Sequence, residues 1–153
     1  MDEILDLDAV GQARAVRDGL VSPRELVGAA IARIEARDGE LNCVVHRRFD
    51  RALEEAAKAP EGTPFRGVPA LVKDLGWTMA GEPYTGGSRT LAGIEAGVDA
   101  NVVTRLRAAG FVVLGRTNTP EFGILPTTEP EHNGPTRNPY DPVYSAGGSS
   151  GGS

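Results

Sequence analysis

The sequence is poor in the residue types that cross-link a chain or bind metal. Its 153 residues include one cysteine, Cys43, and two histidines, His46 and His132. A single thiol excludes an internal disulfide and fits a reducing compartment, so we expect a cytoplasmic protein. None of these residues has the spacing of a metal-ligand set, which predicts no metal centre. Nucleotide-cofactor motifs are also missing, because no Gly-Lys-Ser/Thr follows a glycine run and no dinucleotide fingerprint follows a strand.

Long apolar runs and an excess of positive charge are absent too. No segment approaches the ~18 apolar residues that would cross a bilayer. The acidic first six residues lack the basic-then-apolar order of a signal peptide. With 21 acidic against 16 basic residues the net charge is −5, and the pI is ≈ 5.1. A nucleic-acid-binding surface is therefore disfavoured, and we expect neither a nucleic acid nor a membrane as partner.

Lysine is scarce, and the position of one lysine is informative. All basic residues except Lys58 and Lys73 are arginine. A lysine at the end of a strand is usually a surface residue, but Lys73 follows the apolar run 67–72, which predicts a buried strand. Burial lowers the pKa of a lysine, and neutrality near pH 7 requires a shift of ~3 units. Arginine cannot lose its proton in a protein, whereas lysine can, so Lys73 is a candidate general base.

The apolar pattern predicts alternating helices and strands in one domain. Ser22 and Glu25 form a capping box with Pro23 at the first helical position. A helix, a tight glycine and an apolar strand in succession predict one αβ step onto a mostly parallel sheet, and so an α/β fold. Asn118 is expected to cap a helical turn, and the proline-rich stretch after Gly123 is expected to be a loop. The expected helices cover 8–17, Pro23 to a stop near Gly39, 49–59, and Asp99 to Gly110; the expected strands cover 42–46, 67–72 and 111–114.

The last seven residues, 147–153, are Gly-Gly-Ser-Ser-Gly-Gly-Ser and allow three interpretations. Their composition is typical of a flexible linker or an expression scar. Residues 147–151 also match the G-x-S-x-G nucleophile elbow of hydrolases, but that motif needs a strand leading in, which Pro139 and Pro142 disfavour. In the third interpretation a serine of this run acts with Lys73, since a neutral amine can replace histidine as the base that activates a hydroxyl.

Four blocks, in a fixed order, carry a resemblance to a known family. They are Gly67-Val68-Pro69 with Lys73-Asp74, residues 115–122 (Gly-Arg-Thr-Asn-Thr-Pro-Glu-Phe), residues 134–139 (Gly-Pro-Thr-Arg-Asn-Pro), and residues 147–153. Together they closely resemble the amidase signature family, and the separation between Lys73 and Ser149 suits its lysine and first serine. The resemblance implies that residues 1–153 are the N-terminal part of a single amidase-signature domain, truncated before the nucleophile. It also implies the fold of that domain, an α/β fold with a mixed central sheet covered by helices on both faces.

The resemblance also implies a mechanism. Lys73 would be the general base and Ser149 a bridging serine preceded by a cis peptide bond, whereas the attacking serine would lie beyond Ser153. The full-length enzyme would hydrolyse carboxamide C–N bonds through an acyl-enzyme without a cofactor or metal, and the 153-residue chain alone would be inactive. Gly123, Ile124 and Leu125 fall where the substrate-lining loop of the family lies, which implies an apolar or neutral acyl group.

Within the family, residues 127–131 and 73–75 are similar to bacterial amidases of the aminohexanoate cyclic-dimer hydrolase type. The A subunit of glutamyl-tRNA(Gln) amidotransferase is the alternative, since it shares the glycine–serine block. An alternative of another class is a non-catalytic truncated fragment. We expect a small-molecule amide as the binding partner, and a homodimer is left open. An incomplete sheet would expose apolar faces, which predicts poor solubility.

Overall fold

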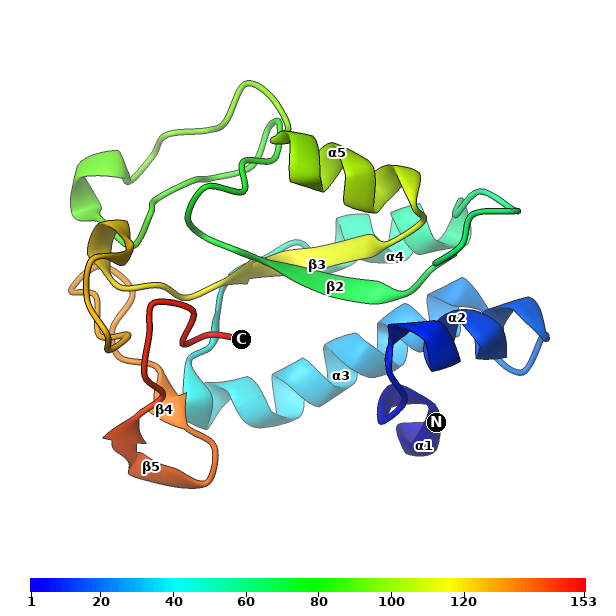
Figure 1. The fold of residues 1–153 in the computed structure, drawn as a ribbon, viewed down its shortest axis with the longest axis horizontal. Helices are drawn as coiled ribbons and strands as arrows, with labels where there is room; N and C mark the ends of the chain where they lie inside the picture. Colours follow the sequence, from blue (N-terminus) through cyan, green and yellow to red (C-terminus); the bar gives the residue numbers. More distant parts are fainter. The chain divides into compact units, whose positions relative to one another are not determined.

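The fold is given by a computed structural model that describes residues 1–153 (Figure 1). Helices and strands alternate between residues 23 and 117, as predicted. The α-helices are α1 (Asp2–Leu5), α2 (Ala9–Arg17), α3 (Pro23–Leu41), α4 (Phe49–Ala57) and α5 (Asn101–Ala108), and the 3₁₀ helices are η1 (Arg89–Leu91) and η2 (Glu121–Gly123). The strands are β1 (Val44–Arg47), β2 (Pro69–Lys73), β3 (Val112–Thr117), β4 (Arg137–Asn138) and β5 (Asp141–Ser145).

Three strands form a mixed sheet in the order β1-β3-β2, and β4 and β5 form a separate two-stranded sheet. β1 is antiparallel to β3. β2 is parallel to β3, because the Val112 N–H donates to the Val68 carbonyl near one end and the Asp74 N–H donates to the Thr117 carbonyl near the other. Figure 1 shows β2 and β3 side by side. The prediction of an α/β fold with a mixed sheet is confirmed.

The chain forms two compact units, each assembled from three separate stretches. The first unit comprises Met1–Ala36, Arg48–Ala70 and Thr104–Leu114, and the second comprises Arg37–Arg47, Leu71–Val103 and Gly115–Ser153. The division falls within β2 and β3, so both strands begin in the first unit and end in the second. The expectation of one amidase-signature domain over 1–153 stays a prediction.

The first unit contains the helix starts that the sequence indicates. The Asp8 carboxylate accepts a hydrogen bond from the Gly11 N–H at 2.7 Å and caps α2. At the start of α3, the Glu25 N–H donates to Ser22 Oγ at 3.2 Å, and the Ser22 N–H donates to the Glu25 carboxylate at 2.9 Å. The capping box is therefore confirmed. The apolar cluster of this unit is formed by Ala15, Val16, Val21 and Leu26, with the half-buried Ile4 and Leu5 packed against it.

The predicted stop of α3 at Gly39 is wrong, because the helix continues to Leu41. Gly39 does not adopt a left-handed conformation; the next residue that does is Asn42, with φ +53°. Asn42 ends the helix, because asparagine, like glycine, can adopt the left-handed conformation that follows many helices. The Asp38 carboxylate then accepts hydrogen bonds from the N–H groups of Cys43 and Val44, which follow the helix.

The predicted end of the strand at Leu114 is also wrong, because β3 continues through Gly115 to Thr117 and all six of its residues are buried. Gly115 continues the strand because it allows close approach of β1. A Cβ atom at Gly115 would lie 2.1 Å from the carbonyl oxygen of His46. Gly115, which the sequence suggested as the end of the strand, is thus required for the close packing of β3 against β1.

Two expectations for the region after β3 are corrected. Asn118 does not cap a helix; the residue before η2 is Pro120, and Asn118 is fully buried. The proline-rich stretch is not loop throughout, because β4 and β5 pair as an antiparallel hairpin. The side chains of the hairpin are largely exposed, with Tyr140 95% and Val143 81% accessible.

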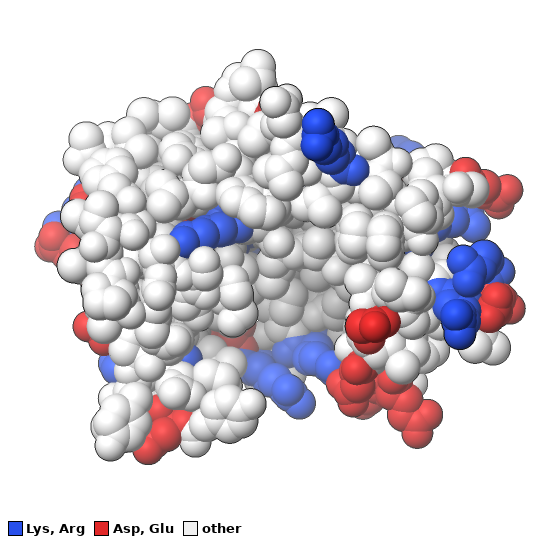
Figure 2. Space-filling model, viewed as in Figure 1, with Lys and Arg blue, Asp and Glu red and all other residues white.

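On the face drawn in Figure 2, charged residues form small separate groups between wide uncharged areas.

Candidate active site

The end of β2 and the C-terminal run come together within the second unit. Lys73 Nζ donates to Ser149 Oγ at 2.8 Å and to Ser150 Oγ at 3.2 Å. The sequence predicted that Lys73 and Ser149, which are 76 positions apart, act together, but it did not single out Ser150. One amine therefore lies within hydrogen-bond distance of two hydroxyl groups, which is the arrangement required for proton transfer.

Lys73 is half-buried rather than fully enclosed. Burial lowers the pKa of Lys73, because desolvation penalises the ammonium form. This is the direction expected for a general base. Beside the amine is a cavity of about 340 Å³, whose wall includes Trp77, Thr117 and Ser150 as well as Lys73.

The glycine–serine run has defined contacts, and these argue against a flexible linker. The peptide bond between Gly148 and Ser149 is cis. The Thr128 hydroxyl donates to the Gly147 carbonyl at 2.7 Å. A Cβ atom at Gly151 would lie 2.2 Å from Thr128 Oγ1, so a side chain at that position would collide with the threonine. The fully buried Thr128 therefore positions the run, a role that its place in the sequence did not indicate.

Asn118 holds the loops around the site together. Its amide group donates to the Gly134 carbonyl at 3.0 Å and to Thr136 Oγ1 at 2.9 Å. Its side-chain oxygen accepts from the Thr119 N–H and from the Asn133 side-chain amide. Asn118 and Thr136 are almost completely buried, as this saturated polar network requires. Both belong to blocks that carried the family resemblance, which is the signal that could have identified them.

The three predicted substrate-lining residues differ in position. Gly123 lies near the serine, because a Cβ atom there would be 3.8 Å from Ser149 Oγ. Ile124 and Leu125 are 77% and 53% exposed. The structure therefore brings Gly123 to Ser149 and leaves the two apolar side chains accessible to solvent. Their role in substrate binding stays a prediction.

Three further observations concern metal sites, membrane spans and the nucleophile elbow. No group of three or more His, Cys, Asp or Glu side chains is arranged to hold a metal ion. No helix combines the length and the apolar character of a bilayer span. A nucleophile elbow requires a strand of the central sheet before the glycine–serine run. The strand that precedes the run is β5, which belongs instead to an exposed two-stranded sheet.

The sequence is similar to one family of enzymes over most of its length. The family model described as Amidase matches residues 25–153. The chain belongs to the amidase family. Among curated amidase relatives, the 6-aminohexanoate-cyclic-dimer hydrolase of Paenarthrobacter ureafaciens is 47% identical over 148 residues, which cover 95% of this chain and 30% of that protein. The A subunit of the glutamyl-tRNA(Gln) amidotransferase of Thermobifida fusca is 41% identical over 160 residues, covering 100% of this chain and 32% of that protein.

Solved amidase structures agree with this assignment. The structure of a 6-aminohexanoate cyclic dimer hydrolase complexed with substrate matches with a TM-score of 0.92 at 47% identity, over 96% of this chain and 30% of that one. A bacterial aryl acylamidase of the amidase signature family matches with a TM-score of 0.88 at 39% identity, over 95% of this chain and 32% of that one. The chain thus spans about a third of the length of the amidases it matches.

Proposed function

We propose that this chain supplies the proton-relay part of an amide hydrolase. The proposal depends on one observation above all, the 2.8 Å contact between Lys73 Nζ and Ser149 Oγ. A lysine whose pKa is lowered by burial can act as a base toward a hydroxyl in direct contact with it. Membership of the amidase family supports the same reaction class.

In the proposed reaction, neutral Lys73 takes the proton of the Ser149 hydroxyl while Ser149 takes the proton of the attacking serine. The attacking oxygen forms a bond to the amide carbonyl carbon. The relay then returns a proton to the leaving nitrogen as the C–N bond breaks, which leaves an acyl-enzyme. Water, activated by the same relay, releases the acid. The attacking serine and the donors that stabilise the oxyanion belong, in this proposal, to a segment outside residues 1–153.

The proposed substrate class is a linear or cyclic amide with an apolar or neutral acyl part. Two relatives, named as hydrolases of a cyclic amide dimer and of aryl acylamides, support this class. The exposed Ile124 and Leu125, next to Gly123, would supply apolar contacts. A cytoplasmic location and a homodimer stay predictions.

The direct test is a chimera. Residues 1–153 replace the matching segment of the Paenarthrobacter ureafaciens hydrolase, and ring opening of the 6-aminohexanoate cyclic dimer is measured as the appearance of the new terminal amino group. We expect the chimera to be active, and Lys73→Ala and Ser149→Ala to lower kcat by about 10²–10⁴-fold, because each interrupts the relay. The rate should rise with pH and level off above the pKa of Lys73, which burial lowers from the ordinary value of a lysine.

Lys58→Ala is the matched control, since Lys58 is the other lysine and is exposed. It should leave kcat unchanged. Substantial turnover by the Lys73→Ala or Ser149→Ala chimera, with the Lys58→Ala chimera equally active, would refute the assigned roles. Amide hydrolysis by the isolated 153-residue chain would contradict the proposal that the nucleophile lies elsewhere.

A second candidate function is the A subunit of a glutamyl-tRNA(Gln) amidotransferase, because the 41% identity to the Thermobifida fusca protein extends over the whole chain. The same relay residues would then release ammonia from an amide for delivery to a partner. A chimera with the Thermobifida fusca protein distinguishes the two functions. Rescue of ammonia transfer only in the presence of partner subunits, without hydrolysis of the cyclic dimer, would favour this candidate.

A further inference from the structure

A second cavity of the second unit lies beside the buried Arg116. Its volume is about 260 Å³, and its wall includes His46, Asp74 and Arg116. Consecutive strand residues point to opposite faces of a sheet. In agreement, Lys73 and Thr117 line the cavity of the candidate active site, whereas their neighbours Asp74 and Arg116 line this one. The two cavities therefore lie on opposite faces of the sheet where β2 and β3 end.

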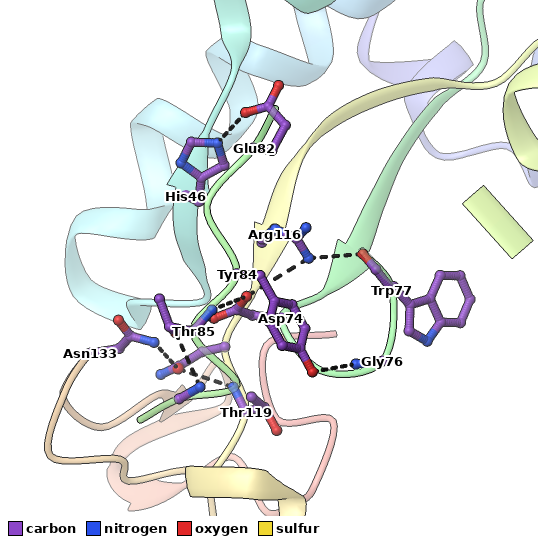
Figure 3. Close-up of polar contacts among 12 residues, drawn as sticks. His46, Asp74, Gly76, Trp77, Glu82, Tyr84, Thr85, Arg116, Thr119 and Asn133 are labelled. Carbon is purple, nitrogen blue, oxygen red and sulfur yellow. Dashed lines mark hydrogen bonds and ion pairs between the residues drawn. The ribbon is translucent and has the colours of Figure 1, made fainter. Parts of the chain in front are cut away.

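Arg116 is only 1% exposed, and part of its guanidinium group has a partner (Figure 3). Nη1 donates to the Trp77 carbonyl at 2.9 Å and lies 3.8 Å from Asp74 Oδ1. The guanidinium carbon lies over the Tyr84 ring, 5.7 Å from its centroid. Nε and Nη2, however, are buried without a hydrogen-bond partner. These two nitrogens share one edge of the planar group, so their N–H bonds form a fork.

The carboxylates near Arg116 are already paired with other donors. Asp74 accepts hydrogen bonds from the Thr85 N–H, at 3.2 Å, and from the Thr85 hydroxyl. Glu82 Oε2 lies 2.8 Å from His46 Nε2. Burial lowers the pKa of Arg116, and the charges of Asp74 and Glu82 oppose that shift. The guanidinium group stays charged at neutral pH, and its free edge lacks an acceptor.

We propose that this cavity binds a small monocarboxylate through the Nε–Nη2 edge of Arg116. Two parallel N–H groups match the two oxygens of a carboxylate better than they match a single acceptor. Apolar groups of Val45, Pro83 and Ala92 complete part of the wall and suit a short aliphatic tail. A dianion is disfavoured, because Asp74 and Glu82 are close to Arg116.

The size of the cavity limits the ligand. At ~30 Å³ for each water in the liquid, 260 Å³ has room for roughly eight waters. Formate, acetate and propionate fit within that space. With so few atoms to bury, we expect a dissociation constant on the order of millimolar. The inference does not depend on the proposed amidase activity.

The test is an NMR titration of the ¹⁵N-labelled protein with acetate at constant ionic strength, balanced with sodium chloride. Acetamide, which has nearly the same shape but no charge and one carbonyl oxygen, is the matched ligand. We expect acetate to shift the Arg116 Nε–H and Thr85 amide resonances in a saturable manner. Acetamide should leave both resonances in place.

Variants identify the binding group. Arg116→Lys keeps the charge but loses the fork, and it should weaken acetate binding by about tenfold or more. Ala92→Leu narrows the cavity at an exposed position and should also weaken binding. Arg105→Lys changes an exposed arginine on α5 and should bind acetate like the wild type.

Three results would overturn the proposal: no saturable shift with acetate, equal shifts with acetamide, or unchanged acetate affinity in Arg116→Lys. If Arg116→Lys fails to fold, the Ala92→Leu variant decides. Wild-type affinity in that variant would place the acetate elsewhere and would contradict the assignment to this cavity.

Discussion

At the scale of single residues, Cys43 has an environment that suppresses its reactivity. Its thiol donates to Asp38 Oδ1 at 2.8 Å, and the other oxygen of Asp38 accepts from Arg47 at 2.8 Å. Burial, together with the Asp38 carboxylate, raises the pKa of Cys43 to about 12 from the usual 9.0. The protonated thiol is therefore the form that the fold favours.

We predict that folded Cys43 reacts slowly with iodoacetamide. A pKa raised from 9.0 to about 12 leaves roughly a thousandfold less thiolate at pH 8. The higher intrinsic nucleophilicity of a more basic thiolate offsets part of this loss, so the rate should fall by ~30-fold or more relative to the unfolded chain. The rate in guanidinium chloride is the reference, and equal rates in both conditions would contradict the assigned environment.

The same shift has a consequence for stability. The native state holds the thiol proton more tightly than the unfolded state. The contribution of Cys43 to the free energy of unfolding is thus fully present below pH 9.0 and is lost as the pH rises through about 12. Cys43→Ser should show a smaller loss of stability than the wild type over that alkaline range.

At the scale of secondary-structure elements, two glycines with similar sequence signals have opposite roles. Gly39 lies inside α3, where an added Cβ atom would meet no atom within 4 Å apart from its chain neighbours and the backbone of its own helix, whereas Gly115 faces the His46 carbonyl across the β1–β3 pair. Both looked like the ends of elements. The local sequence does not show which glycine has another strand beside it, because that contact is made between segments far apart in the chain.

We predict that Gly39→Ala and Gly115→Ala shift stability in opposite directions. Gly39→Ala should stabilise by about 0.5–1 kcal/mol, because alanine is the better helix former. Gly115→Ala should destabilise by about 3 kcal/mol or more, since its Cβ atom would lie 2.1 Å from a backbone oxygen. Urea denaturation monitored by circular dichroism measures both. A Gly115→Ala variant as stable as wild type would mean that β1 does not pair closely with β3.

Elements with a strong local signal were predictable, and those that depend on distant contacts were not. The capping box at Ser22 and the helices of the first unit follow from local pattern, and the structure has them. The β4–β5 hairpin was missed because its strands are short, and because Pro139 lies between them and Pro142 lies within β5. At the candidate site, Lys73 and Ser149 were identified by motif order, whereas Thr128 and Asn118 act through tertiary hydrogen bonds that no spacing rule indicates.

At the scale of the whole molecule, exposed apolar side chains promote self-association most strongly at the pH where the net charge is close to zero. Tyr140, Val143 and Tyr144 of the hairpin region are all more than 60% exposed. The net charge of −5 at pH 7 falls toward zero near the pI of ≈ 5.1. Exposed apolar strands associate most readily when electrostatic repulsion between molecules is weakest.

We predict that solubility is lowest near pH 5 and that Val143→Lys raises it at pH 7. Ala36→Lys, at an exposed position of α3, changes the net charge equally and serves as the control. Static light scattering across a concentration series measures self-association. A monodisperse wild-type protein with no difference between the two variants would show that the hairpin does not drive association.

Side chains at the end of β2 point alternately to the two faces of the sheet. The position of each side chain there therefore depends on the number of residues in the strand as well as on their types. Lys73 and Asp74 are neighbours in sequence but reach different cavities. One inserted residue within β2 would turn the carboxylate toward Ser149 and the amine toward Arg116. An insertion there would therefore exchange base and acid between the two faces, a change that no single substitution produces, whereas the loops that follow can vary in length without this effect.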